Sequence, residues 1–112
     1  DLEFNKFTRV IPIHNLFTCK FNDISYWYYT IKINSLSLKD RDKLILRLKK
    51  LGIETRPMFY PISDMKIYKK YLKGSSINSK NISYSSLSLP TYPTLTKKEI
   101  VYVSKNLKKL IS

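Results

Sequence analysis

The sequence predicts a small α+β domain in which an antiparallel or mixed β-sheet is covered by helices on one face. Three observations lead to this prediction: a run of β-forming residues at 27–33, a helical pattern from Asp40, and a capped helix after Thr96. With 112 residues, of which 43% are hydrophobic, the chain can form one modest core. Strands and helices in this order form a sheet layer with helices packed against it.

The first 24 residues carry the weakest signal and form a lead-in of uncertain structure. Residues 10–13 could make a short strand, which Pro12 confines to a sheet edge or a strand start. The domain itself is expected to extend over residues 25–112.

The next elements are a strand, a helix and a second strand. Residues 27–33 are almost all β-formers and predict a strand. The helix begins at Asp40 and ends at Gly52, with apolar residues recurring at helical spacing: Leu44, Ile45, Leu48 and Leu51. Residues 53–56 are expected to form the second strand, which Pro57 closes.

The segment after Pro61 predicts a short helix and a loop. Asp64 can cap a helix that continues to Tyr71 or Leu72 and that places three side chains inward: Ile67, Tyr68 and Tyr71. Residues 74–81, rich in Ser and Asn, indicate a loop. Residues 82–87 could add one helical turn, and residues 88–90 a brief extended piece.

The last helix has the clearest start. Thr96 and Glu99 form a T-x-x-E capping box, in which each side chain satisfies a free backbone N–H of the first turn. One face of the helix is then apolar: Ile100, Val103, Leu107 and Leu110. Pro90 and Pro93 exclude regular structure just before it.

The formal charge of +13 would suit a nucleic-acid-binding protein, but the distribution of basic residues argues against one. They are scattered, and all but Arg9, Arg41, Arg47 and Arg56 are lysines, whereas phosphate and base recognition favours arginine. The chain also contains no alanine and is rich in Ile, Lys, Asn and Tyr, a bias that AT-rich coding sequences produce. A basic module that binds nucleic acid or another anionic partner remains the alternative.

Composition also bears on the cellular setting. No apolar run approaches the ~20 residues that span a bilayer, and no signal-peptide pattern is present, so we expect no membrane association. A single cysteine, Cys19, excludes an internal disulfide. These features indicate a reducing, cytoplasmic setting.

The residues that could carry catalysis are few. The single histidine, His14, has no second ligand at metal-binding spacing, and Cys19 has no neighbouring base in the sequence. The two glycines, Gly52 and Gly74, are too few for a phosphate-binding loop. We expect neither a metal site nor a self-contained active site.

One stretch, residues 52–61, is unusual. Arg56 leaves a strand end between prolines and aromatic residues that stiffen the backbone, so its guanidinium could bind a phosphate or carboxylate beside an aromatic surface. A structural alternative is that Arg56 pairs with a local carboxylate while Phe59 and Tyr60 belong to the core.

The chain resembles the C-terminal region of the DegT-type sugar aminotransferases, the group that includes perosamine synthetase. The resemblance rests on segments in the family's order between Ser25 and Ile111: residues 25–29, 41–44, 52–57 and 59–63, Tyr68, and residues 87–96. It implies the small C-terminal domain of a fold type I pyridoxal-phosphate enzyme. Such an enzyme is usually a homodimer and moves an amino group, commonly from glutamate, to a keto-sugar on a nucleoside diphosphate.

The same resemblance implies which residues could act. The small domain completes the substrate cleft, which places Arg56 and Tyr60 near the nucleotide-sugar. Ser63 stands where many relatives have histidine, so no acid–base role is expected there. The family's Schiff-base lysine, pyridine-binding aspartate and glycine-rich turn lie in the large domain, which is absent from this chain. We therefore expect no catalytic or cofactor-binding residue, no bound pyridoxal phosphate and no transamination by this chain alone.

Three hypotheses follow. The first is a domain or fragment of a sugar aminotransferase that needs the large domain. The second is the basic binding module, whose mark would be a steep salt dependence of binding. The third is a small structural partner whose apolar face docks on another chain.

Overall fold

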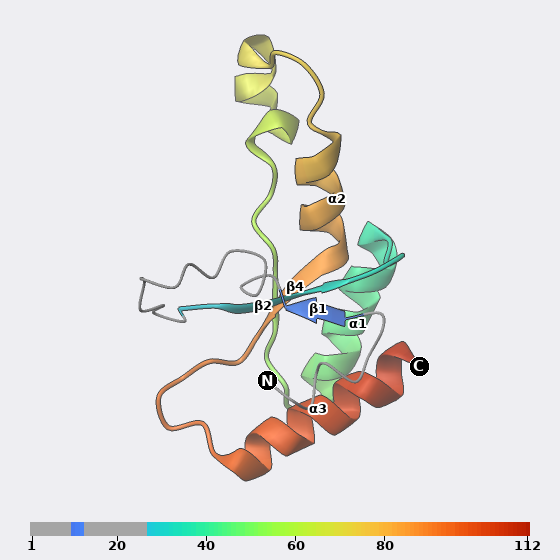
Figure 1. Cartoon of the computed structure of the whole chain (residues 1–112), viewed down its shortest axis with the longest axis vertical. Coiled ribbons are helices and arrows are strands. Elements are labelled where there is room, and N and C mark those ends of the chain that lie inside the picture. The colour runs from blue at the N-terminus through green and yellow to red at the C-terminus, as the bar shows by residue number, and fades with distance from the viewer. Residues whose placement is uncertain (1–9, 13–26) are drawn as a thin grey trace.

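The computed structural model describes residues 10–12 and 27–112, so His14 and Cys19 lie outside the described residues. Four strands pair antiparallel within these ranges, in the order β1–β2–β4–β3 (Figure 1). Their bounds are Val10–Pro12 for β1, Tyr29–Ile33 for β2, Arg56–Pro57 for β3 and Ser86–Leu89 for β4. The predicted α+β class and the short strand in the lead-in are confirmed, and the sheet is antiparallel.

One face of the sheet carries the core. Helices α1 (Leu38–Lys50) and α3 (Lys97–Ile111) supply its other half. The buried apolar side chains come from the strands, both helices and the segment before β3: Val10, Ile31, Ile33, Leu44, Leu48, Ile53, Leu87, Leu89, Val103 and Leu107. Alternate residues of a strand face opposite sides, which is why Ile31 and Ile33 are buried with Leu87 and Leu89.

Helix α1 has defined signals at both ends. Ser37 caps it by accepting a 3.1 Å hydrogen bond at Oγ from the Asp40 N–H, so the helix begins two residues before the predicted Asp40. At the other end, Ile53 N–H donates to the Leu48 carbonyl and Gly52 N–H to the Lys49 carbonyl, the two bonds of a Schellman motif. Gly52 has a φ of +75°, a backbone conformation that would be strained for a residue with a side chain.

The capping box of α3 is confirmed. Thr96 Oγ1 accepts from the Glu99 N–H at 3.3 Å, and Glu99 Oε2 accepts from the Thr96 N–H at 2.7 Å. Val103 and Leu107 face the core as predicted, and Leu110 packs against it. Ile100 is exposed, because it lies in the first turns, where α3 extends beyond the sheet (Figure 1).

Residues 58–85 form an arm that projects away from the sheet (Figure 1). The outgoing half holds two 3₁₀ helices, η2 (Ile62–Asp64) and η3 (Lys66–Tyr71), and the returning half is helix α2 (Ile77–Ser85). Asp64 joins the two halves: its carboxylate accepts from the Tyr84 hydroxyl and lies 2.7 Å from Lys80 Nζ. Arg41 on α1 is buried and donates from Nη1 to the Ser83 carbonyl at 2.9 Å, which fixes the base of the arm.

The arm is where the predictions from sequence were wrong. Ile67, Tyr68 and Tyr71, expected to face inward, are 43–70% exposed, because the arm has no second layer of described chain to pack against. The predicted helix from Asp64 is two 3₁₀ segments. The expected loop at 74–81 contains the start of α2, and residues 86–87, expected to be helical, belong to β4. Ser and Asn are poor helix formers, but tertiary hydrogen bonds at Ser83, to Arg41 and to the Phe59 carbonyl, override that preference.

Two strand boundaries also differ from the prediction. β2 starts at Tyr29 instead of residue 27, and β3 is Arg56–Pro57, whereas residues 53–55 belong to neither a helix nor a strand. Residues 90–95 contain neither helix nor strand, as the two prolines predicted.

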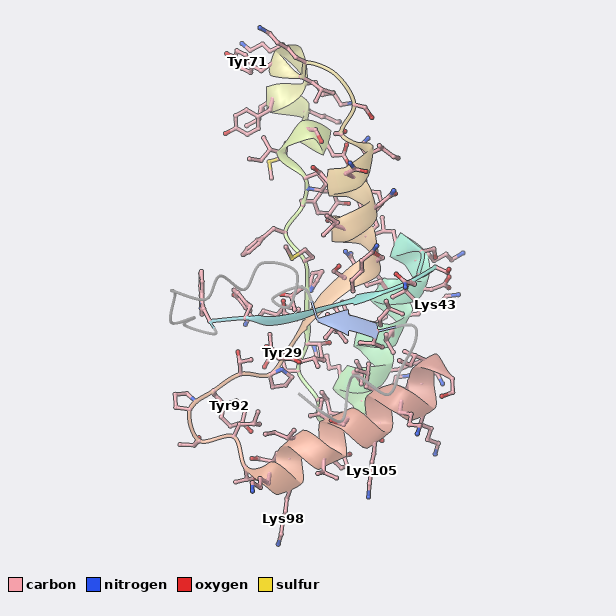
Figure 2. The ribbon with its side chains drawn as sticks, in the orientation of Figure 1. Tyr29, Lys43, Tyr71, Tyr92, Lys98 and Lys105 are labelled. Atoms are coloured by element: carbon pink, nitrogen blue, oxygen red, sulfur yellow. The ribbon has the colours of Figure 1, made fainter. Side chains whose placement is uncertain are left out.

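Side chains of the described lysines point in several directions. Lys98 and Lys105 project outward from α3, and Lys43 from α1 on another side of the molecule (Figure 2). Over the described ranges, no helix combines the length and the apolar character needed to cross a bilayer.

Candidate functional site

Arg56 reaches the surface through the alternating burial of residues 53–56. After the Schellman turn, Ile53 and Thr55 point inward and are buried, so Glu54 and Arg56 point outward. Arg56 pairs with Ser88 across the sheet, and Ser88 pairs with Thr30, so the three side chains share the face opposite the core. Thr30 Oγ1 and Ser88 Oγ lie 2.9 Å apart on that face.

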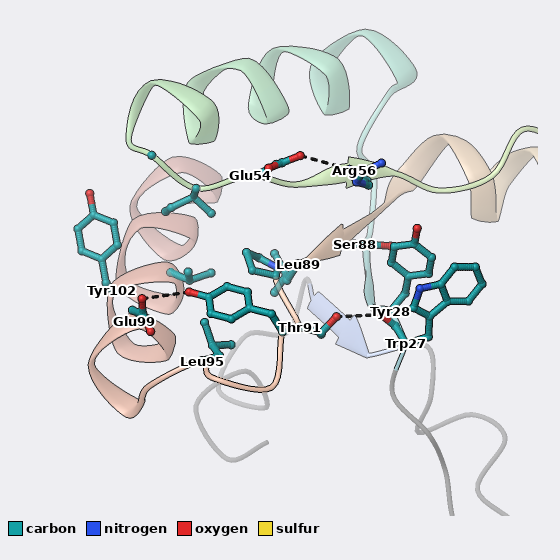
Figure 3. A pocket seen from close by; sticks show the side chains of 15 residues that line it. Trp27, Tyr28, Glu54, Arg56, Ser88, Leu89, Thr91, Leu95, Glu99 and Tyr102 are labelled. Atoms are coloured by element: carbon teal, nitrogen blue, oxygen red, sulfur yellow. Dashed lines mark hydrogen bonds and ion pairs between the residues drawn. The ribbon is translucent and has the colours of Figure 1, made fainter.

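Two hollows meet at Arg56. The larger, of about 620 Å³, extends from Arg56 to the N-terminal end of α3 (Figure 3). The smaller, of about 310 Å³, lies on the other side of Arg56, towards the base of the arm. The side chains that line both hollows are Tyr28, Arg56 and Ser88. Arg56 therefore has access to a ligand in either space.

The guanidinium of Arg56 has one carboxylate close by. Its Nη2 lies 3.4 Å from Glu54 Oε1, and the two side chains are 67% and 81% exposed. An ion pair that is this open to water contributes about 0–1 kcal/mol, so a bound anion can replace Glu54 at little cost.

Aromatic rings border the Arg56 side of the hollows. Trp27 and Tyr28 lie with their ring centroids 4.7 Å apart, and Tyr28 meets Phe59 edge-on at 6.0 Å. The backbone carbonyl of Trp27 accepts a 2.9 Å hydrogen bond from Thr91 Oγ1, which ties this end of β2 to the loop after β4 (Figure 3). The arrangement offers aromatic surface beside a cation.

The far end of the larger hollow is closed by side chains of α3 and the loop before it. The Tyr92 hydroxyl donates to Glu99 Oε1 at 3.0 Å, and the Tyr102 hydroxyl donates to the Leu51 carbonyl at 3.0 Å. The hydrogen bond from the Thr96 backbone, together with those from the Thr96 and Tyr92 side chains, lowers the pKa of Glu99 below its ordinary value of 4.5. The bond to Glu99 raises the pKa of Tyr92 above 10.0.

These bonds predict a pH dependence of stability. Because folding lowers the pKa of Glu99, its contribution is present above pH 4.5 and is lost as the pH falls through its folded pKa. Glu99→Gln should therefore be less stable than the wild type at neutral pH and lose less stability on acidification. Urea unfolding at neutral pH and at about pH 3 measures both effects. Tyr92→Phe removes one of the donors to Glu99, so it should change the free energy of unfolding in the same direction but by less. If Glu99→Gln lost as much stability as the wild type between neutral pH and about pH 3, Glu99 would not be the group responsible.

The structure separates the two residues predicted to bind substrate. Arg56 borders both hollows, whereas Tyr60 lines neither; its half-exposed ring lies on the arm, 6.4 Å from the ring of Tyr84. The structural alternative was right that Arg56 has a local carboxylate and wrong that Phe59 and Tyr60 are core, since both are exposed. Sequence reasoning placed Trp27 at the first position of the expected strand and did not connect it with Arg56, whereas Trp27 lies before β2 on the border of the larger hollow.

The described residues do not supply a metal or cofactor site in this region. Within residues 10–12 and 27–112, no group of three or more His, Cys, Asp or Glu side chains is placed to hold a metal ion. Among the described residues that line the two hollows at Arg56, none is a lysine. A pyridoxal-type cofactor needs a lysine amine within its site, so these hollows do not fit one.

Comparison with known protein families gives one match of nearly full length. The model of the family described as DegT/DnrJ/EryC1/StrS aminotransferases matches residues 3–108, which includes the lead-in as well as the stretch from Ser25. A curated relative, GDP-perosamine synthase from Escherichia coli O157:H7, is 26% identical over 112 residues, which are 100% of this chain and 29% of the relative. GDP-perosamine synthase from Caulobacter vibrioides is 32% identical over 75 residues, 67% of this chain and 20% of the relative.

Solved structures match the fold. Helicobacter pylori PseC, an aminotransferase involved in the biosynthesis of pseudoaminic acid, superposes with a TM-score of 0.83 at 18% identity, over 99% of this chain and 29% of that one. Spr1654 from Streptococcus pneumoniae in its PMP form gives 0.79 at 21% identity, over 99% and 28%. The chain therefore spans less than a third of the proteins it matches.

Proposed function

The chain belongs to the DegT/DnrJ/EryC1/StrS aminotransferase family, and on that premise we propose that it forms one wall of the substrate cleft in an enzyme that aminates a keto-sugar linked to a nucleoside diphosphate. The rest of the enzyme would be a large domain homologous to the part of the relatives that this chain does not span. As in the sequence-based expectation, the assembled enzyme would be a homodimer, and its sugar product would be of the perosamine type.

One observation carries the proposal: an exposed arginine borders two hollows, and the carboxylate that pairs with it among the described residues is weakly held. A guanidinium presents several N–H donors in a plane and binds phosphate oxygens in pairs. Two of the curated relatives are named for a sugar linked to guanosine diphosphate, which is the kind of anion that such a site would bind.

In this proposal, Arg56 holds the diphosphate and thereby orients the sugar carbonyl towards the rest of the enzyme. Tyr60 is an outer contact on the arm, beyond Phe59, which lines the smaller hollow. The family depends on pyridoxal phosphate, but the hollows at Arg56 do not fit that group, so the large domain would bind it and carry out the chemistry. The role of this chain is to bind and position the substrate.

The proposal is tested with a chimaeric enzyme in which this chain replaces the matching C-terminal 29% of the Escherichia coli relative. We expect the chimaera to bind pyridoxal phosphate and to transfer the amino group of glutamate to a GDP-linked 4-keto sugar. The same relative truncated before the junction is the control and should be inactive. A chimaera that folds and binds the cofactor but transfers no amino group to nucleotide-linked keto-sugars would overturn the proposal.

A further inference from the structure

Trp27 and Arg56 lie on the border of the same hollow, and from this placement we infer that they form a nucleoside-diphosphate subsite. The indole ring of Trp27 stacks on the base, and the guanidinium of Arg56 binds the diphosphate. The inference rests on the proposed function and deepens it, because it assigns the nucleotide half of the substrate to particular side chains.

Trp27 has the properties of a stacking platform. It is 75% exposed, the highest value among the large hydrophobic side chains of the described residues, and so contributes little to the core. Its position is nevertheless fixed, since Thr91 holds its backbone carbonyl and the Tyr28 ring supports the indole at an interplanar angle of 36°. A base stacked on an aromatic ring of this kind gains about 1–3 kcal/mol.

Phosphate binding at Arg56 has a competitor within the chain. Glu54 holds the guanidinium through the 3.4 Å ion pair, and its carboxylate also repels an approaching phosphate. The ion pair is exposed and weak, so it does not prevent exchange, but it lowers the apparent affinity. Removing the charge of Glu54 should therefore strengthen nucleotide binding, which a role for Glu54 in holding the ligand would not do.

Trp27 is the single tryptophan of the chain, so its fluorescence reports on this subsite directly. The experiment titrates the 112-residue chain with GDP, UDP and inorganic pyrophosphate. We expect GDP and UDP to quench the fluorescence to saturation. Pyrophosphate should displace GDP without quenching on its own, because it lacks a base to stack.

Three variants separate the subsite from the general attraction of anions to a chain of charge +13. Arg56→Ala should weaken GDP binding by about tenfold or more, as expected for the loss of a charge-assisted pair of hydrogen bonds. Arg47→Ala removes an equal charge from the exposed side of α1 and should change the affinity by less than roughly twofold. Glu54→Gln should tighten binding by roughly two- to fivefold.

Several results would overturn the inference. These are the absence of quenching by GDP in the millimolar range, equal quenching by pyrophosphate, or equal losses of affinity in the Arg56 and Arg47 variants. The proposed function is judged separately, by amino transfer in the chimaera. If amino transfer depends on Arg56 while Trp27 fluorescence does not respond to the base, the subsite is wrong and the proposed function stands.

Discussion

In the chimaeric enzyme, Arg56→Ala is expected to lower kcat/KM for the nucleotide-linked keto-sugar by roughly 30- to 700-fold, which corresponds to about 2–4 kcal/mol of lost transition-state stabilisation. The loss should fall on the half-reaction with the keto-sugar and spare the half-reaction with glutamate, which carries no diphosphate. Arg56→Lys keeps the charge but not the paired N–H donors, so it should recover only part of the activity. Single-turnover measurements of the two half-reactions give the comparison.

A purely structural role for Arg56 predicts a different pattern. An arginine that only tethers its own strand through Glu54 would lower the melting temperature and reduce both half-reactions equally. Because the ion pair is exposed, we expect the melting temperature of Arg56→Ala to stay close to that of the wild type. Equal losses in the two half-reactions, accompanied by reduced stability, would exclude the substrate role.

The largest effect on stability is expected from a different arginine. Arg41 is 3% exposed and its guanidinium donates to the Ser83 carbonyl at 2.9 Å and to Asp42 Oδ1 at 2.7 Å. Arg41→Ala would leave a void and a buried carbonyl without its donor, at a cost of about 2–4 kcal/mol in the free energy of unfolding. For a domain of ordinary stability, about 5–15 kcal/mol, this is a large fraction.

Asp42→Ala is the matched control for Arg41→Ala. It removes the exposed partner of the guanidinium but leaves the buried bond to Ser83 and the packing of the Arg41 side chain in place, so it should cost less than Arg41→Ala. Urea unfolding of both variants gives the comparison. If the two variants were equally destabilised, the buried bond between α1 and α2 would not be the important contact.

The sequence predicted the helices correctly where local signals and the positions of the core residues agreed. The capping box at Thr96, the glycine stop at Gly52 and the apolar spacing of α1 all depend on neighbouring residues, and each was predicted close to its observed place. The arm could not be predicted in the same way. Its helices are built from Ser, Asn, Lys and Tyr without a clear apolar face, and contacts such as the one between Arg41 and Ser83 decide where they end.

The candidate site was predicted in part. Arg56 was identified from its position at the end of an expected strand, and its exposure follows from the alternation that buries Ile53 and Thr55. The residues around Arg56 were not identified from the sequence. Trp27 borders the same hollow because β2 pairs with β4, and Tyr60 lies on the arm, away from the hollow. The burial of Arg41 did have a signal in the sequence: Arg41, Leu44 and Leu48 share one helical face.

The arm also bears on how much of this chain a cell would maintain. It exposes apolar side chains along its length, including Ile62, Ile67 and Tyr71, and such surfaces are what chaperones and quality-control proteases recognise. A copy whose arm is covered by a partner would escape that recognition, whereas a copy produced in excess would be degraded. The abundance of the chain would then follow the supply of its partner instead of its own rate of synthesis.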